Sequence, residues 1–383
     1  MATVREDKDV HSNNGNGAAR EPVASPLSTS MEEDTSNYSV FDFLQHRILT
    51  HYPQAVQIRK REMPEPRMAI VYPTYVCNQD CLWCEYASEN TEHHSIMTDE
   101  QLIGLIKDLD GIGVKSVEFC GGGEPSLHPK LPEAIRDLAS RGMSCGILTN
   151  GTKVMGDLAE ALVDHGSYVR VGFDGGTEET FNKVKRPKTP SAGFKAVCDN
   201  VRNLIKMRNE RNTKCRISMK LVVDQGNMHE VREAVELAIE LNVDSVQFKA
   251  ARLVDSELNY EQAEQVNRDI TAAREDLGDE MAIIGGCSKI NATTQCWLTP
   301  LQLTVDTLGD VYMCCYYTHR KEKHTIGNCF TDPLSDLWYH EDHWKKIDAI
   351  EPCECNNLDC RFVKYNEIMD KVMVEDDAQF EFI

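Results

Sequence analysis

The sequence contains one stretch on which its interpretation depends, Tyr75-Val76-Cys77-Asn78-Gln79-Asp80-Cys81-Leu82-Trp83-Cys84. Its cysteines follow the spacing C-x3-C-x2-C. Three thiolates on one short loop can bind three corners of an iron–sulfur cube, which leaves one iron open to a further ligand. A structural zinc site is the alternative, but zinc favours a closed tetrahedron of four ligands, and this loop has no obvious fourth. We therefore predict a cluster bound by Cys77, Cys81 and Cys84.

Composition limits the class of protein. The chain has 383 residues and a net charge of -21, with 62 acidic against 41 basic residues. This balance argues against nucleic acid and against an anionic membrane surface. No apolar run approaches the ~20 residues of a spanning helix, and the first residues lack the apolar core of a signal peptide. We expect a cytoplasmic protein with reduced cysteines.

Strand and helix patterns alternate through the middle of the chain. Helix patterns separate six apolar stretches that predict strands, at residues 68–72, 114–119, 145–148, 168–174, 216–223 and 245–249. Such alternation favours parallel pairing. The fold class is therefore α/β, a parallel six-unit partial TIM barrel, and functional groups should gather at the C-terminal strand ends.

The predicted organisation has six parts. In chain order these are a disordered acidic and polar tail (1–38), a helix with a connector (39–66), the partial barrel (67–255), a helical linker (256–286), a small cysteine-rich domain with a β-hairpin and helices (287–366), and an acidic C-terminal tail (367–383).

A glycine-rich motif, Gly121-Gly122-Gly123-Glu124, follows the second predicted strand. Glycines let a backbone approach a ligand closely, and Glu124 can accept a hydrogen bond from an ammonium group. An ordinary glycine-rich turn is the alternative. Together with the cysteine loop and Trp83, however, the motif resembles the radical SAM enzymes. In that family the open iron of a 4Fe-4S cluster chelates S-adenosylmethionine, and the glycine motif holds its methionine amino group.

The resemblance implies further contacts with S-adenosylmethionine. Gly172 and Asp174, near the end of the fourth strand, correspond to positions near the ribose or methionyl part, although Gly172 replaces the usual serine. Arg186 falls where relatives place a basic residue on the methionine carboxylate, with a solvated loop charge as the alternative. Lys220 and Lys249, in strands five and six, either face the substrate or lie outside the barrel.

The second group of cysteines begins with Cys296, and a hairpin with the turn Leu308-Gly309-Asp310 should bring Cys296 close to Cys314. Residues 290–366 resemble the twitch and SPASM extensions of radical SAM enzymes. No cysteine follows Cys360, which implies a single auxiliary 4Fe-4S cluster. Its other two ligands should come from Cys353, Cys355 and Cys360, and the choice among them stays open. A zinc ribbon is the alternative.

These parts together resemble enzymes that remove hydrogen from carbon with a 5′-deoxyadenosyl radical. We expect dehydrogenation of an alcohol in a small polar substrate, such as a sugar or aminocyclitol, with a reductant such as flavodoxin or ferredoxin. One alternative is an epimerase, in which Cys287 would return a hydrogen atom. Others are a peptide-modifying enzyme and a non-catalytic iron–sulfur or zinc protein. The substrate and the oligomeric state stay open.

Overall fold

The computed structural model describes residues 45–252, 255–287, 291–318, 320–355, 360 and 362–373. The predicted tail 1–38 and residues 374–383 of the predicted C-terminal tail lie outside the described residues. All the elements named below belong to one structural unit within residues 38–383.

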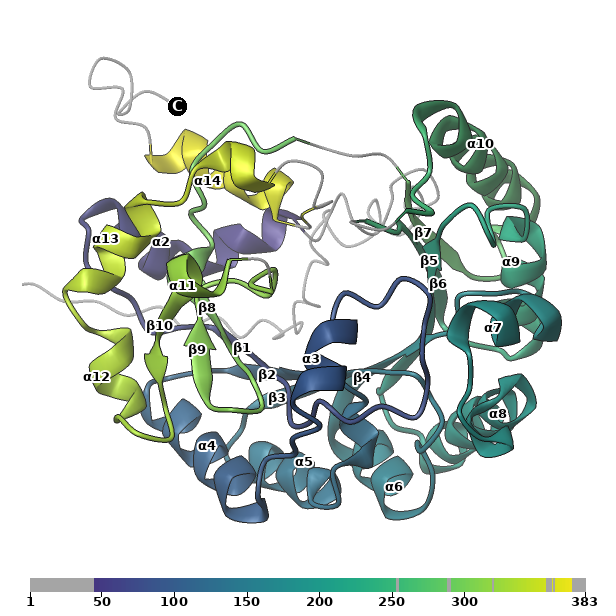
Figure 1. Cartoon of the computed structure of the whole chain (residues 1–383), viewed down its shortest axis with the longest axis horizontal. Helices are drawn as coiled ribbons and strands as arrows, with labels where there is room; N and C mark the ends of the chain where they lie inside the picture. The colour runs from purple at the N-terminus through teal and green to yellow at the C-terminus, as the bar shows by residue number, and fades with distance from the viewer. Residues whose placement is uncertain are drawn as a thin grey trace, which may run out of the picture. The chain divides into compact units, whose positions relative to one another are not determined.

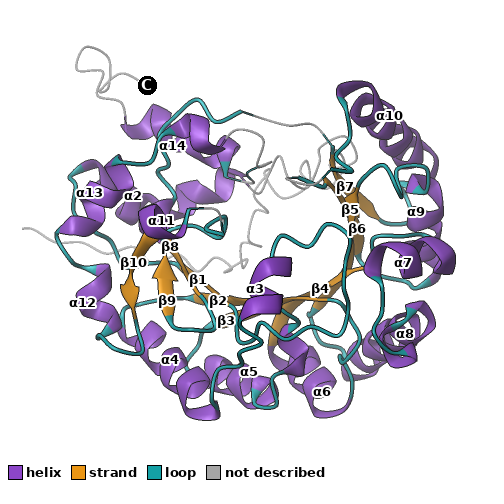
Figure 2. Ribbon diagram, in the orientation of Figure 1, coloured by secondary structure: helices purple, strands orange, loops and turns teal. Residues whose placement is uncertain are grey.

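The described strands form one curved sheet, with helices along its outer face (Figures 1 and 2). Its order is β10-β9-β8-β1-β2-β3-β4-β5-β6-β7. Neighbours from β8 through β1 to β7 pair in parallel, whereas β9 is antiparallel to both β8 and β10. The strands are β1 (Met68–Val71), β2 (Ser116–Phe119), β3 (Ser144–Thr149), β4 (Gly166–Gly172), β5 (Arg216–Val223), β6 (Ser245–Ala250), β7 (Ala282–Gly286), β8 (Gln302–Val305), β9 (Asp310–Tyr312) and β10 (Thr325–Asn328).

The main hydrophobic core lies between this sheet and the outer helices. The helices are α2 (Tyr52–Arg59), α3 (Ala87–Glu92), α4 (Asp99–Gly111), α5 (Leu131–Ser140), α6 (Gly156–His165), α7 (Glu178–Lys185), α8 (Phe194–Arg211), α9 (Val231–Glu240), α10 (Tyr260–Leu277), α11 (Lys321–His324), α12 (Leu334–Trp338), α13 (Asp342–Asp348) and α14 (Val363–Met373). Short 3-10 helices are η1 (Gln45–His51), η2 (Pro125–Leu127), η3 (Pro190–Ala192), η4 (Thr299–Leu301) and η5 (Pro352–Cys355). No helix in the described part is long and apolar enough to cross a membrane.

Local sequence signals account for several boundaries. Helix α4 begins with the capping box that the sequence predicts: Gln101 N–H donates to Thr98 Oγ1 at 3.1 Å, and Thr98 N–H donates to Gln101 Oε1 at 2.8 Å. These two bonds satisfy two backbone donors that the first turn of a helix otherwise leaves without partners. The predicted hairpin turn is also present, with Gly309 at φ 88°, a conformation that glycine adopts without strain.

The prediction of an α/β parallel, open partial barrel is confirmed, but the sheet is longer than predicted. Residues 256–286 are not wholly a helical linker, because β7 follows α10 and pairs in parallel with β6. The hairpin of the cysteine-rich segment is not a separate layer either, because β8 pairs in parallel with β1. Pairing with β8 satisfies backbone groups along β1 that would otherwise form an exposed sheet edge.

Two helices were missed in segments that the sequence suggested were irregular. Helix α7 occupies the segment before Arg186, which we interpreted as a loop. Helix α14 extends to Met373, so the predicted tail from residue 367 is wrong over its first seven positions. Buried side chains follow helical spacing in α14, namely Val363, Asn366, Met369 and Met373, and these hold it against the chain.

Asp306, directly after β8, is a buried acid that joins the hairpin to the cysteine loop. Its Oδ1 accepts hydrogen bonds from the backbone N–H of Leu308 at 2.9 Å and of Asp310 at 3.0 Å. Its Oδ2 accepts from the hydroxyl of Tyr75 at 3.1 Å. Burial, with the nearby charge of Asp310, raises the pKa of Asp306 from 3.8 to about 6.

The substitution Asp306→Asn should reduce the pH dependence of stability. Because the folded pKa of Asp306 is raised, its contribution to stability is full below pH 3.8 and is lost as pH rises through about 6. Each pKa unit corresponds to about 1.4 kcal/mol. The wild type should therefore lose about 3 kcal/mol relative to Asp306→Asn between pH 3.5 and 7, as measured by urea unfolding. Parallel stability curves for the two proteins would contradict this prediction.

Candidate functional site

The cysteine loop leaves β1 at its C-terminal end and is held by the chain around α7. The backbone N–H of Leu82 donates to Val184 O at 3.0 Å, and that of Asp80 donates to Lys185 O at 3.1 Å. On the other side, in the glycine-rich motif, the backbone N–H of Gly123 donates a hydrogen bond to Thr74 O at 2.8 Å. Two separate segments therefore hold the loop and the residues that lead into it.

The three loop thiols lie near one another and face side-chain amides. Asn150 Nδ2 donates to Cys77 Sγ at 4.0 Å, and Asn90 Nδ2 donates to Cys84 Sγ at 3.8 Å. Burial raises the pKa of Cys77 to about 11, and burial with the charge of Cys81 raises the pKa of Cys84 to about 12. These thiols therefore need a positively charged partner, such as iron, to ionise at neutral pH.

The glycine motif is shaped by its contact with the cysteine loop. A Cβ on Gly122 would lie 2.1 Å from the ring of Tyr75, and one on Gly123 would lie 2.2 Å from Val76 O. The glycines therefore allow the two loops to pack directly on each other. Packing between the two loops therefore explains part of the need for glycine at these positions, independently of any ligand.

Glu124 closes the motif and is almost fully buried, with 2% of its surface exposed. Its carboxylate accepts from Thr149 Oγ1 at 2.6 Å, from the backbone N–H of Asn150 at 2.6 Å and from the backbone N–H of Ser126 at 3.0 Å. These bonds orient the carboxylate firmly. Carboxylate oxygens have about four acceptor sites, so Glu124 can still accept a bond from an ammonium group.

A buried ion pair lies beneath the cysteine loop. Lys185 Nζ lies 2.9 Å from Asp174 Oδ2, and both side chains are almost completely buried. Burial alone would lower the pKa of Lys185, but the charges of Asp174 and Cys81 raise it above its ordinary value. Asp174 Oδ1 also accepts from Val222 N–H at 2.6 Å. The Asp174 carboxylate is thus engaged by the protein itself, and Gly172 lies beside the pair.

Arg186 does not join this arrangement. It ends α7 at φ 46°, and its side chain is exposed, whereas its neighbour Lys185 points inward. Lys185 Nζ lies 5.5 Å from the centre of the Trp83 ring. The cation beneath the cluster loop is therefore Lys185, which sequence reasoning missed because it expected a loop rather than a helix with one buried face.

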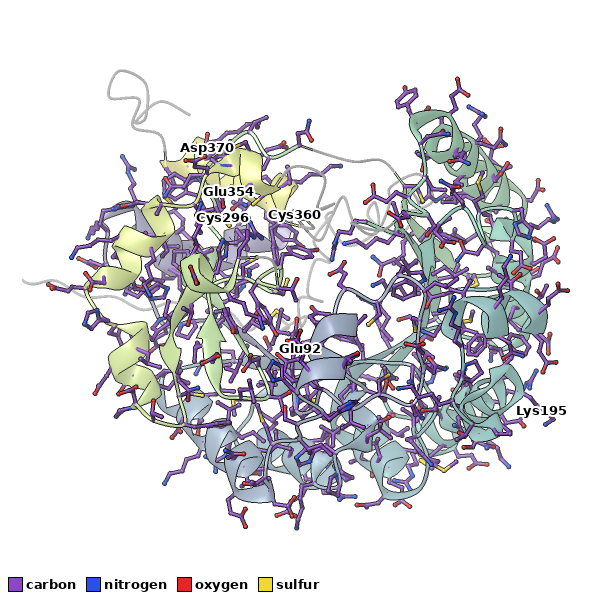
Figure 3. All side chains as sticks on the ribbon, in the orientation of Figure 1. Glu92, Lys195, Cys296, Glu354, Cys360 and Asp370 are labelled. Atoms are coloured by element: carbon purple, nitrogen blue, oxygen red, sulfur yellow. The ribbon has the colours of Figure 1, made fainter. Side chains whose placement is uncertain are left out.

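Cys296 and Cys360 of the second cysteine group lie close to α14 (Figure 3). Five thiols lie close enough to affect one another electrostatically, namely Cys296, Cys314, Cys315, Cys355 and Cys360. Burial raises the pKa of Cys360 to about 12. Cys353 is exposed, and its Sγ lies 3.6 Å from Glu351 Oε2. Of the three candidate ligands that the sequence left open, Cys355 and Cys360 therefore lie near Cys296, whereas Cys353 is exposed.

Two further side chains support these thiols. Asn366, on α14, donates from Nδ2 to Cys296 Sγ at 3.6 Å, and its Oδ1 accepts from Trp297 N–H at 2.8 Å. The guanidinium of Arg320 donates from Nη1 to Cys355 Sγ at 3.6 Å. Sequence reasoning missed both residues, although the helical spacing of residues 363–373 could have indicated that Asn366 faces inward.

Other predicted residues have different positions. Cys287 is buried in the core between the sheet and the helices, which favours a packing role. Cys329 packs on the same core, whereas Cys315 packs on the cluster that contains Tyr72 and also lies beside Cys314. Lys220 and Lys249 are half-buried on their strands. Cys120, directly after β2, is a nearby thiol to which the sequence assigned no role.

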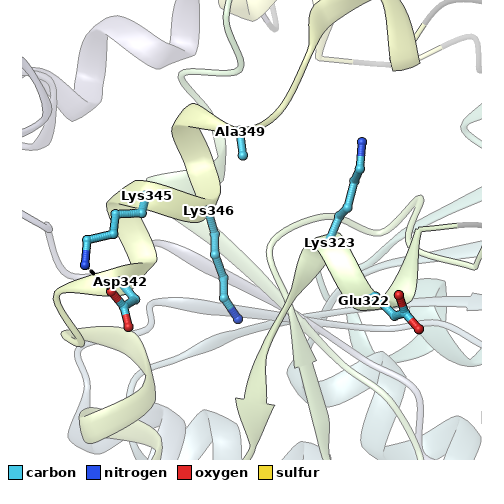
Figure 4. Close-up of a pocket in the computed structure, with 6 residues that line it drawn as sticks. All are labelled: Glu322, Lys323, Asp342, Lys345, Lys346 and Ala349. Atoms are coloured by element: carbon cyan, nitrogen blue, oxygen red, sulfur yellow. Dashed lines mark hydrogen bonds and ion pairs between the residues drawn. The ribbon is translucent and has the colours of Figure 1, made fainter.

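A surface hollow elsewhere holds none of these residues (Figure 4). Charged side chains from α11 and α13 surround it, and Lys345 pairs there with Asp342. Its lining residues are Glu322, Lys323, Asp342, Lys345, Lys346 and Ala349.

The cysteine sites fit iron–sulfur clusters by their donor chemistry. The indole Nε1 of Trp83 is buried and has no hydrogen-bond partner in the described part of the chain, so it can donate to a group bound at the loop. Among the described residues, no three His, Cys, Asp or Glu side chains converge on one metal ion. Cysteines of a 4Fe-4S cube each bind a different iron and need not converge in this way.

Family models match both regions of the chain. Residues 71–238 match the radical SAM superfamily, and residues 296–361 match the SPASM iron–sulfur cluster-binding domain. The chain therefore belongs to the radical SAM superfamily and carries a C-terminal SPASM-type domain. The family implies S-adenosylmethionine, a 4Fe-4S cluster that binds it, and auxiliary iron–sulfur binding, which sets aside the zinc alternatives.

Curated relatives match about half of the chain. Fe-coproporphyrin III synthase of Methanosarcina barkeri is 26% identical over 197 residues, which are 49% of this chain and 47% of that protein. A probable GTP 3′,8-cyclase of Metallosphaera sedula is 29% identical over 175 residues, 45% of this chain and 52% of that protein. The chain spans about half the length of these relatives.

Solved structures share the fold at low identity. SuiB of Streptococcus suis, bound to the precursor peptide SuiA, has a TM-score of 0.61 at 16% identity, covering 84% of this chain and 75% of SuiB. The structure of anSMEcpe with bound AdoMet has a TM-score of 0.57 at 18% identity, covering 80% and 96% of the two chains. These likenesses show the fold alone.

Iron content should separate Cys355 from Cys353. We expect Cys355→Ala to lower iron after anaerobic reconstitution from about eight to about four per chain, because one cube would lose a ligand. Cys353→Ala is the matched control and should keep about eight. Equal iron loss in both variants would contradict the assignment of Cys355 as a ligand and Cys353 as an outer thiol.

Loss of the buried cation should destabilise the fold. Lys185→Met leaves Asp174 buried without its partner, and such a change costs about 3–5 kcal/mol. Lys183→Met removes an exposed charge from the same helix and should change the free energy of unfolding by less than about 0.5 kcal/mol. Urea unfolding measures both. Equal free energies of unfolding for the two variants would show that the Lys185–Asp174 ion pair does not stabilise the fold.

Proposed function

We propose that this chain is a radical SAM oxidoreductase that removes hydrogen from a carbon of a small polar, sugar-like substrate and converts an alcohol to a ketone. Cys77, Cys81 and Cys84 would hold the cluster that binds S-adenosylmethionine, with Glu124 on the methionine amino group. Cys296, Cys314, Cys355 and Cys360 would hold the auxiliary cluster. We expect a cytoplasmic enzyme that takes electrons from flavodoxin or ferredoxin.

One observation supports the oxidation: a cluster of tyrosines contacts residues next to both cysteine groups. Tyr86, two residues after Cys84, shares a hydrogen bond of 2.9 Å between hydroxyl groups with Tyr72. The ring of Tyr72 lies 5.9 Å from that of Tyr317, and Cys315 packs on the same cluster. This series of contacts supports electron transfer between the two proposed clusters.

The bound groups would supply the reactive species, namely a 5′-deoxyadenosyl radical at the first site and a one-electron acceptor at the second. The chain's own task is to orient the substrate and to accept the proton that leaves the alcohol. Lys220 suits the first task. Burial with the charge of Lys249 lowers its pKa from 10.5 to about 8, so it stays mostly protonated at neutral pH and can contact a polar group of the substrate.

A radical epimerase is the second candidate, for which we propose Cys120 rather than Cys287 as the hydrogen donor. Cys287 lies in the core on the helix side of the sheet, but Cys120 packs beside Tyr72 and Tyr317. Cys120 is therefore the better placed thiol to return a hydrogen atom. Peptide modification stays an alternative, since SuiB, which shares the fold, has been solved with a precursor peptide.

The Cys81→Ala variant should form no 5′-deoxyadenosine with dithionite and S-adenosylmethionine, because its loop would keep only two of three ligands. Cys198→Ala, at a buried cysteine on α8 away from the loop, should retain the activity. Chromatography of the anaerobic mixture measures the product. Continued 5′-deoxyadenosine formation by Cys81→Ala would rule out this active site.

Turnover in deuterated water separates the two reactions. With a panel of sugars, dehydrogenation should give a product two hydrogens lighter without solvent deuterium at carbon. Epimerisation should give a product of unchanged composition that carries one deuterium, and Cys120→Ser should abolish that incorporation. Mass spectrometry distinguishes these results. Deuterium incorporation with no oxidised product would overturn the dehydrogenase proposal.

A further inference from the structure

We propose that the concave face of strands β4–β6 binds an anionic group of the substrate through Arg170, Lys220 and Lys249. This inference rests on the proposed function and narrows its substrate class to molecules that carry phosphate or carboxylate groups. It replaces the expectation of an aminocyclitol, whose positive charge would be repelled by these side chains.

Strand register places the three cations on one face. Alternate residues of a strand point to the same side, and Gly172 of β4 pairs with Lys220 of β5, as Val222 pairs with Lys249 of β6. Arg170, Lys220 and Lys249 are all half-buried. The adjacent residues of these strands point to the other side of the sheet and pack in the core beneath the helices. They are Val169, Val171, Met219, Val246 and Phe248. The cations therefore lie on the inner, concave side of the curved sheet (Figure 1).

Arg170 and Lys220 lack an ion-pair partner within the described part of the chain. Neither side chain forms an ion pair there, although surface cations such as Arg136 and Arg208 do. Burial and then the charge of Lys249 lower the pKa of Lys220, Asp174 opposes this change, and Arg170 adds a smaller lowering. Like charges in a half-buried setting are unfavourable, so a bound anion would relieve their repulsion.

Nearby carboxylates are engaged elsewhere. Glu85 lies 2.6 Å from Arg252, and Asp174 lies 2.9 Å from Lys185. Glu118 accepts a hydrogen bond from the hydroxyl of Tyr168. Glu85 and Asp174 thus pair with other cations and form no ion pair with Arg170 or Lys220. The absence of an ion pair at these two cations within the described residues favours a binding role, in a chain whose net charge is -21.

Side-chain positions around Arg170 are also constrained. Its guanidinium lies over the Tyr168 ring at 5.5 Å. The ring in turn lies against Gly146, where a Cβ would be 2.3 Å from it. Lys249 Nζ lies 3.3 Å from the hydroxyl of Tyr316. Aromatic contacts therefore hold two of the cations in place, which lowers the entropy lost when they bind an anion.

Equilibrium binding tests the site without turnover. Inorganic pyrophosphate and citrate are titrated separately into the full chain with reconstituted clusters and saturating S-adenosylmethionine, by anaerobic calorimetry at constant ionic strength. Hydrogen bonds to charged groups contribute about 1.5–3 kcal/mol. Lys220→Met should therefore weaken binding by about tenfold or more, and Lys220→Arg should largely retain it.

Lys195→Met is the matched control, since Lys195 lies on the outer helix α8 with 82% of its side chain exposed (Figure 3). It should bind as the wild type does. Stronger binding of pyrophosphate indicates a phosphorylated substrate, and stronger binding of citrate indicates a carboxylate. The proposal fails if the wild type binds neither anion, or if Lys220→Met binds as tightly as Lys195→Met. If the wild type forms no 5′-deoxyadenosine, the proposed function is refuted, but a measured anion affinity that depends on Lys220 still supports the binding site.

Discussion

The parallel pairing of β1 with β8 is the interaction on which both cysteine sites depend. Strand β1 carries the loop of Cys77 to Cys84 at its end, and β8 begins the hairpin that leads to Cys314. The cysteine loop follows the C-terminal end of β1, whereas Cys296 precedes β8 and Cys314 follows β9, which runs back toward the start of β8. The shared sheet therefore fixes the position of one cysteine group relative to the other. The rings of Tyr72 and Tyr317, one from each segment, lie 5.9 Å apart. A sheet that ended at β1 would leave the second site without this position.

Charge is distributed unevenly around this frame. The whole chain is strongly acidic, yet cations occupy its interior positions. Lys185 is paired with Asp174 beneath the cysteine loop, and Arg170 and Lys220 face the concave side of the sheet. Burial of a charge is costly unless a partner compensates for it. The paired cation is therefore part of the fold, and Arg170 and Lys220, which form no ion pair within the described residues, are the cations that we propose bind a ligand.

Much of the fold could be predicted because its signals are local. Six strands, the capping box at Thr98 and the turn at Gly309 each depend on residues close in sequence. Strand β7 and helix α14 were missed because short or polar segments become regular only when neighbouring elements bury one face. The cysteine spacing indicated the cluster loop, but Lys185 was missed, since its burial depends on packing between α7 and that loop.

By itself, the sequence determined the chemistry of the donor groups: three closely spaced thiols, a glycine-rich motif with Glu124, and a second group of cysteines near the C-terminal end of the chain. Only the tertiary structure decided which of these groups meet. It brought Cys355 and Cys360 to Cys296 while Cys353 stayed exposed, and it placed Lys220 and Lys249 on one face. The physical reason is that ligand spacing is a property of the local chain, whereas proximity across strands depends on sheet register and on which surfaces are buried.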